Sequence, residues 1–146
     1  MPDQEVEILI VEDNPTDLEL TLRALRKVNL ANTVLAVGDG AQALDFLFAE
    51  GAYSGRDGTA HPRVVLLDLK LPKVDGTEVL RRIKGDPRTA LVPVVVLTSS
   101  AEERDRLASY QLGANSFIVK PVEFDSFARA VTEVGMYWML LNRAPV

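Results

Sequence analysis

The sequence has no cysteine and a single histidine, which excludes several kinds of site. Without thiols there is no disulfide, no thiolate metal site and no cysteine nucleophile. His61 has neither a cysteine nor a paired acid at ligand spacing, so we assign it no ligand role. The Walker pattern GxxxxGK(S/T) is also missing, and nucleotide binding by such a loop has no support.

Basic residues are outnumbered by acidic ones, and long hydrophobic runs are missing. The chain has 16 Lys and Arg against 21 Asp and Glu, and its formal net charge is −5. This balance offers no basic surface for nucleic-acid phosphates, so we expect no direct nucleic-acid binding. No stretch approaches the roughly 18 apolar residues of a membrane span, and the N-terminus does not resemble a signal peptide. We therefore expect a soluble, cytoplasmic protein without membrane contact.

Five short apolar runs rich in β-branched residues indicate strands covered on both faces. They occupy residues 6–11, 33–37, 64–67, 94–97 and 117–119. Between the runs, apolar residues recur at helical spacing, as in Leu18, Leu22 and Leu25, and Pro15 suits a first helical turn. This alternation predicts an α/β fold with a doubly wound, five-stranded parallel sheet. With 146 residues, 47% of them hydrophobic, we expect one domain, 1–146, without an output domain.

Polar residues follow four of the five apolar runs. The first run ends in Glu12 and Asp13, the third in Asp68, the fourth in Thr98, and the fifth in Lys120. In parallel sheets of this kind, ligands bind beyond the carboxyl ends of the strands. Any one of these residues alone is more often a helix cap or a solvated side chain. Their joint occurrence at one edge indicates a site.

This combination of acids, a hydroxyl and an ammonium group suits phosphoryl chemistry. Three crowded carboxylates repel one another, and a hard divalent cation such as Mg²⁺ or Mn²⁺ relieves that repulsion. Phosphoryl transfer also needs positive charge and hydrogen-bond donors, which the metal, Lys120 and Thr98 could supply. We therefore predict that Asp68 is a phosphoacceptor.

The segments ILIVEDN, VVLLDLKLPKVDG, VVVLTSS and FIVKP resemble the receiver domain of two-component response regulators. The resemblance implies a flavodoxin-like (βα)5 fold with strand order 2-1-3-4-5. It also implies a metal site, a phosphate contact and a switch. The metal ligands would be Glu12, Asp13, Asp68 and the backbone carbonyl of Lys70; Lys120 would contact the phosphoryl group; Thr98 and Phe117 would form the switch. The family usually has a cis bond at the position of Lys120-Pro121.

The resemblance further implies a signalling protein and not an enzyme in the usual sense. A sensor histidine kinase would donate the phosphoryl group to Asp68, and water would later remove it. Thr98 would then move inward and Phe117 would fill the space, which changes the face of the fourth helix, fifth strand and fifth helix. Phe117 stands where Tyr is common, so no phenolic hydrogen bond can fix its outward state. We also predict that the Lys70 side chain makes the phosphorylated form long-lived, because positions 70 and 100 tune water access in this family.

Residues 50–62 form a connection longer than the usual four to six residues or so, and its glycines suggest mobility. An insertion here, with the ED-N-P opening, resembles short response regulators that pair with bacterial phytochrome-type histidine kinases. A bacteriophytochrome kinase is therefore the expected partner.

The last helix is apolar nearly all around in its closing turns, more than one buried stripe requires. We expect a homodimer through the face of the fourth and fifth helices, with Trp138, Tyr137 and Leu141 buried in the interface. Docking of this end on the kinase, or its packing on the long loop, is the alternative.

Two other functions compete with the phosphorylated switch. An aspartyl phosphatase usually needs a second acid two residues after the nucleophile, and Lys70 occupies that position. A receiver-like scaffold that is never phosphorylated would be favoured by an incomplete set of acid, hydroxyl and lysine residues. The set here is complete.

Overall fold

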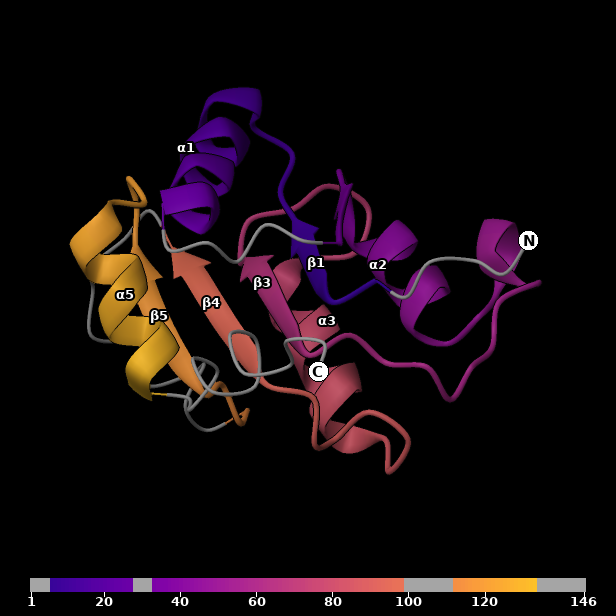
Figure 1. The fold of residues 1–146 in the computed structure, drawn as a ribbon. Helices are drawn as coiled ribbons and strands as arrows, with labels where there is room; N and C mark the ends of the chain where they lie inside the picture. Colours follow the sequence, from indigo (N-terminus) through magenta and orange to yellow (C-terminus); the bar gives the residue numbers. More distant parts are fainter. Residues whose placement is uncertain (1–5, 28–32, 99–111, 134–146) are drawn as a thin grey trace, which may run out of the picture.

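A computed structural model describes residues 6–27, 33–98 and 112–133. The strands are β1 (Ile8–Val11), β2 (Val34–Val37), β3 (Val64–Asp68), β4 (Val94–Thr98) and β5 (Ser116–Val119). The helices are α1 (Pro15–Lys27), α2 (Gly40–Leu47), α3 (Gly76–Gly85) and α5 (Phe124–Glu133), with a 3-10 turn, η1 (Gly51–Tyr53). All strand pairs are parallel, in the order β2-β1-β3-β4-β5 (Figure 1). The predicted sheet and its strand order are confirmed.

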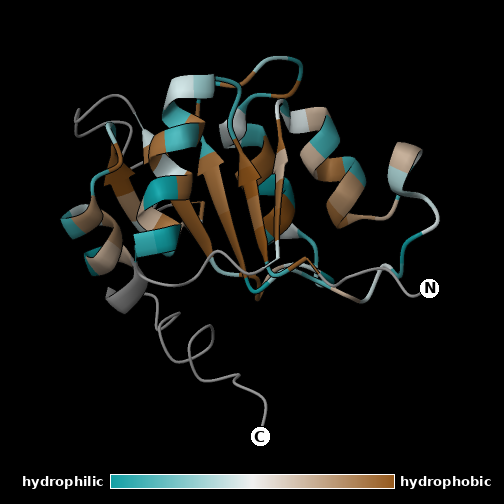
Figure 2. Cartoon of the chain, turned by 45° about the horizontal axis from the view of Figure 1, so that its top comes forward, coloured by the Kyte–Doolittle hydropathy of each residue, from teal (hydrophilic) through white to brown (hydrophobic). Residues whose placement is uncertain are grey.

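Helices cover both faces of the sheet and form two separate cores. One core joins one set of alternating strand residues to α2 and α3, and the other joins the remaining set to α1 and α5. Figure 2 shows the hydrophobic colour concentrated in the strands, while the helices also carry polar residues. Because strand side chains alternate between the faces, each residue at a strand end is directed toward one pair of helices.

The register places the predicted site residues at one edge. Asp68 pairs with Leu97, and Thr98 pairs with Val119, so both belong to strands and not to the loops that follow. Both strands end one residue later than predicted from the apolar runs, since a polar side chain does not prevent backbone pairing. Asp68 and Thr98 are therefore held by the sheet itself.

The connection from α2 to β3 has more structure than its glycines suggest. It contains η1, and the ring of Tyr53 packs edge-on against Phe46 with 5.3 Å between ring centroids. The Arg56 guanidinium lies 3.9 Å from the centroid of the Phe46 ring and donates hydrogen bonds to the carbonyl oxygens of Phe46 and Ala60. The segment therefore folds back onto the end of α2.

Several predictions concern residues outside the described ranges. The fourth helix, Ser100 and the interface residues Trp138, Tyr137 and Leu141 all lie there. The dimer and the single-domain organisation stay predictions. Among the described helices, none has both the length and the hydrophobicity needed to cross a membrane.

Candidate functional site

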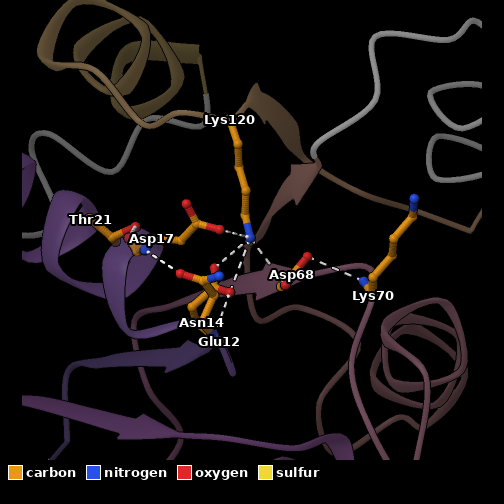
Figure 3. A network of polar contacts seen from close by, with 7 residues as sticks. All are labelled: Glu12, Asn14, Asp17, Thr21, Asp68, Lys70 and Lys120. Atoms are coloured by element: carbon orange, nitrogen blue, oxygen red, sulfur yellow. Dashed lines mark hydrogen bonds and ion pairs between the residues drawn. The ribbon is translucent and has the colours of Figure 1, made fainter.

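Lys120 lies at the centre of the predicted site, directly after β5, and its bond to Pro121 is cis as expected. Its Nζ atom lies 2.8 Å from Glu12 Oε1, 2.9 Å from Asp17 Oδ2 and 3.1 Å from Asp68 Oδ2 (Figure 3). Only 9% of the Lys120 side chain is exposed. Three carboxylates from β3, α1 and the end of β1 thus share one buried ammonium group.

Glu12 is the most deeply placed of these acids. Its Oε2 atom accepts hydrogen bonds from the backbone N–H of Asn14 and from Lys120 Nζ. Its Oε1 atom is close to Nζ but accepts no hydrogen bond of good geometry from the described residues. Burial raises the pKa of Glu12, the hydrogen bond from Lys120 lowers it, and the charge of Asp68 raises it again, bringing it to about 7.

The ammonium group of Lys120 is charged under all ordinary conditions. Burial lowers the pKa of Lys120, but its hydrogen bonds to Glu12 and Asp17 and the negative charge of Asp68 outweigh burial. The pKa therefore lies above its usual range, and the site keeps one fixed positive charge.

Asp68 ends β3 and is only 5% exposed. It lies on the same side of the sheet as Val64 and Leu66, which pack in the core of α1 and α5. Its Oδ1 atom accepts a hydrogen bond from the Lys70 backbone N–H at 3.2 Å, and Oδ2 faces Lys120. The sheet and one backbone donor thus fix the carboxylate at the strand end.

Carboxylate oxygens of Glu12, Asp13 and Asp68 all lie within 4.8 Å of one another. This all-oxygen donor set fits a hard divalent cation. One lysine cannot balance these acids and Asp17 as well, so a second cation would relieve the repulsion. Lys70 is exposed, and its side chain extends away from the acids (Figure 3).

Thr98 and Phe117 occupy the opposite side of the sheet from Asp68. Thr98 ends β4, is 2% exposed, and its carbonyl accepts a hydrogen bond from the Lys120 backbone N–H at 2.7 Å. Phe117 is half-buried against the core of α2 and α3. The backbone of Lys120 therefore connects the Thr98 strand to the acidic cluster.

The loop after Asp68 is held by the start of α2. The backbone N–H of Gly40 donates to the carbonyl of Pro72, and Lys73 Nζ lies 3.6 Å from Asp39 Oδ2. A Cβ atom on Gly40 would lie 1.9 Å from the carbonyl oxygen of Val74, so only glycine fits there. On the other side of the loop, a Cβ atom on Gly76 would lie 2.1 Å from the carbonyl oxygen of Asp68. The loop that contains Lys70 is thereby enclosed between two helix starts.

The structure brings together the predicted residues Glu12, Asp13, Asp68 and Lys120, and it adds Asp17, which the sequence analysis missed. Asp17 lies in the first turn of α1, where an acid ordinarily caps or stabilises the helix start. The sequence feature that could have identified Asp17 is Pro15. It marks the helix start and so places Asp17 about one turn after the acidic pair Glu12 and Asp13. His61, assigned no role, lies in the connection before β3.

The chain is similar to known regulators in sequence. A family model for the response regulator receiver domain matches residues 8–132. The probable methanogenesis regulatory protein FilR2 of Methanothrix harundinacea is 42% identical over 139 residues, covering 94% of this chain and 86% of FilR2. The response regulator Rcp1 of Synechocystis is 36% identical over 132 residues, covering 90% of this chain and 88% of Rcp1.

Solved structures agree with these relatives. The bacteriophytochrome response regulator AtBRR is 56% identical, with a TM-score of 0.82 and coverage of 97% of this chain and 100% of that one. The Mn²⁺-bound form of Rcp1 is 34% identical, with a TM-score of 0.74 and coverage of 98% and 99%. Sequence and fold therefore indicate the same family.

Proposed function

Because the chain belongs to the family of response regulator receiver domains, we propose that it is a switch in which Asp68 accepts a phosphoryl group. The observation that carries this proposal is the position of the Asp68 carboxylate. It lies 3.1 Å from Lys120 Nζ and within 4.8 Å of the carboxylate oxygens of Glu12 and Asp13. Receiver domains bind a divalent metal, and the same acids supply suitable ligands.

In the proposed reaction, an oxygen of Asp68 attacks the phosphorus of a phosphohistidine in a sensor histidine kinase. The P–N bond breaks, its electron pair leaves with the imidazole nitrogen, and that nitrogen takes up a proton. Lys120 donates a hydrogen bond to a phosphoryl oxygen as negative charge shifts. Hydrolysis of the acyl phosphate by water later releases inorganic phosphate and restores the carboxylate.

Glu12, Asp13, Asp68 and the backbone carbonyl of Lys70 would hold Mg²⁺ or Mn²⁺. A bound divalent cation supplies positive charge to the phosphoryl oxygens and screens the carboxylates from one another. The Mn²⁺-bound form of the relative Rcp1 supports a cation of this kind. The donor set gives an independent reason, because it consists of carboxylate oxygens and a second cation would reduce their mutual repulsion.

The signal would leave the site through Thr98 and Phe117. Thr98 would approach the new phosphoryl oxygens, and the Phe117 ring would change its position against the core of α2 and α3. The surface that responds would be formed by the fourth helix, β5 and α5. On this surface Val119 is apolar and 37% exposed, which supports contact with a second copy of the chain.

The proposed donor is a bacteriophytochrome-type histidine kinase in the cytoplasm. AtBRR, described as a bacteriophytochrome response regulator, shares 56% of its residues with this chain and supports this assignment. The phosphatase alternative stays disfavoured, because the side chain two residues after Asp68 is the exposed Lys70.

The experiment is incubation with Mg²⁺ and acetyl phosphate, followed by intact mass, for wild type and Asp68→Asn. We expect one phosphoryl adduct in wild type and none in Asp68→Asn. Asp75→Asn is the matched control, since Asp75 is an exposed acid that caps α3 outside the cluster, and it should still form the adduct. A wild-type chain that never acquires the adduct would identify the unphosphorylated scaffold instead.

A further inference from the structure

Asp17 contacts Lys120 as closely as the acids of the predicted metal site do. The two residues are 103 positions apart, and Asp17 Oδ2 lies 2.9 Å from Lys120 Nζ. Glu12 and Asp68 accept from the same Nζ atom at 3.0 and 3.1 Å. An ammonium group has three N–H donors, and three carboxylates accept them here.

The position of Asp17 is fixed by α1 and not by Lys120. Asn14 caps the helix, with its Oδ1 atom accepting the Asp17 backbone N–H at 3.0 Å. The hydroxyl of Thr21, which is fully buried, donates to the Asp17 carbonyl at 3.1 Å. Figure 3 shows Asp17 and Thr21 together on α1, with the Asp17 carboxylate directed toward Lys120. The start of α1 therefore fixes the backbone of Asp17, and the Asp17 carboxylate contacts Lys120 at the strand ends.

We infer that Asp17 is a positioning residue for the phosphoryl reaction: with Glu12, it holds two N–H groups of Lys120 so that the third is directed at Asp68. This inference rests on the proposed function. When Asp68 takes up the phosphoryl group, only the third N–H has to move, from a carboxylate oxygen of Asp68 to a phosphoryl oxygen. No other bond of Lys120 is broken, and no proton is transferred.

Without the Asp17 charge, the ammonium group is free to rotate among the remaining acids. Its N–H is then directed at the phosphoryl group for a smaller part of the time, and the reaction slows. A hydrogen bond between two charged groups is replaced by a weaker one, so the rate of adduct formation should fall by roughly tenfold or more in Asp17→Asn. The amide keeps the shape of the side chain and a weaker acceptor.

The plain alternative is that Asp17 only stabilises the start of α1 through the helix dipole. A double-mutant cycle separates the two roles, with adduct formation from acetyl phosphate followed by intact mass. Asp17→Asn should slow the reaction in the wild-type background and change it less than about twofold in the Lys120→Met background. Glu19→Gln removes one charge from the exposed face of the same helix, where Glu19 pairs with Arg23 and Arg26, and should have no effect. An unchanged rate in Asp17→Asn, or an equal loss in both backgrounds, would overturn the inference.

A second measurement does not depend on phosphorylation or metal. The Nζ–H protons of Lys120 should give a proton-exchange-protected NMR signal in wild type and in Glu19→Gln. In Asp17→Asn that signal should be lost to faster exchange with water. Retention of the signal in Asp17→Asn would also overturn the inference, while adduct formation on Asp68 in wild type would leave the proposed function standing.

Discussion

Buried charged side chains are paired differently at the two edges of the sheet. At the edge where the strands begin, Glu7 precedes β1 and faces Arg63, which precedes β3, with 3.7 Å between Glu7 Oε2 and Arg63 Nε. Lys84 at the end of α3 donates to the carbonyl oxygens of Ala90 and Val92, just before β4. At the edge where the strands end, Lys120 is shared by three acids.

The two edges therefore contain charged groups of two kinds: those that stabilise the fold and those that form the proposed site. At the first edge Glu7, Arg63 and Lys84 each have a partner that the fold itself supplies. At the second edge Glu12, Asp17 and Asp68 share the ammonium group of Lys120, and Asp13 lies close to Glu12 and Asp68. An arrangement that lacks positive charge is unfavourable for folding and favourable for binding a cation. Stability measurements with and without Mg²⁺ should therefore distinguish the two edges.

The largest effect is expected for Lys120→Met. Removal of one partner from a buried charge cluster costs about 3 kcal/mol, because the remaining carboxylates lose the one cation that the described residues place among them. Mg²⁺ should return more stability to this variant than to wild type, since the metal no longer competes with an ammonium group. Urea unfolding followed by circular dichroism, with and without Mg²⁺, measures both quantities. An equal gain from Mg²⁺ in the two proteins would show that the two cations do not share the acids.

Lys84→Met tests the opposite edge. The variant loses two hydrogen bonds from a half-buried ammonium group to backbone carbonyls, so we expect a loss of about 2 kcal/mol. Burial already lowers the pKa of Lys84, and no acid contributes to that shift. Mg²⁺ should therefore change the stability of this variant as much as that of wild type. If Mg²⁺ stabilised Lys84→Met more than wild type, the two edges of the sheet would not differ in how their charged groups respond to the metal.

Asp68→Asn should have a smaller effect of opposite sign. Removing one of several like charges reduces repulsion, so the free energy of unfolding without metal should rise by about 1 kcal/mol. In Mg²⁺ the advantage should shrink, because the variant has lost a metal ligand. Thermal unfolding in EDTA and in Mg²⁺ compares the two states. A destabilised Asp68→Asn protein in EDTA would mean that its pair with Lys120 outweighs the repulsion.

Glu7→Gln makes a similar neutralisation at the other edge and should have the smallest effect. Its partner Arg63 is partly exposed, so the ion pair contributes about 0.5–1 kcal/mol, and the variant should be destabilised by that amount. The sign of the change is the informative result. We expect Asp68→Asn to stabilise the protein. If Glu7→Gln also stabilised it, the pairing of opposite charges would not account for the stability of the edge where the strands begin.

The sequence predicted the sheet well because buried parallel strands leave a strong local signal. Continuous apolar runs located β1, β3 and β4, and the polar residues directly after or at their ends located Glu12, Asp68 and Thr98. Parallel order then required these residues to lie at the same edge of the sheet, with Thr98 on the opposite face from Asp68. The parallel order of the strands was sufficient to predict that Glu12, Asp68 and Thr98 lie at one edge.

The missing parts depend on contacts that no local pattern records. Asp17 is one acid among several on α1, and its contact with Lys120 exists only because β5 and α1 meet in three dimensions. The fold of the connection before β3 likewise depends on Arg56 stacking on Phe46, ten residues earlier in α2. Strand ends are predictable from composition, whereas side-chain partners across the fold are not.

The two glycines at the starts of α2 and α3 limit how this protein can change over evolutionary time. Neither Gly40 nor Gly76 contributes a side chain to the site, yet each borders the loop that contains Lys70 so closely that even a methyl group would displace it. Exposed positions on the same helices are free to drift and to adapt to new partners. The phosphoryl site can therefore stay the same while the outer surface diverges. Gly40 and Gly76 take no part in the reaction, but they fix the position of the loop that contains Lys70.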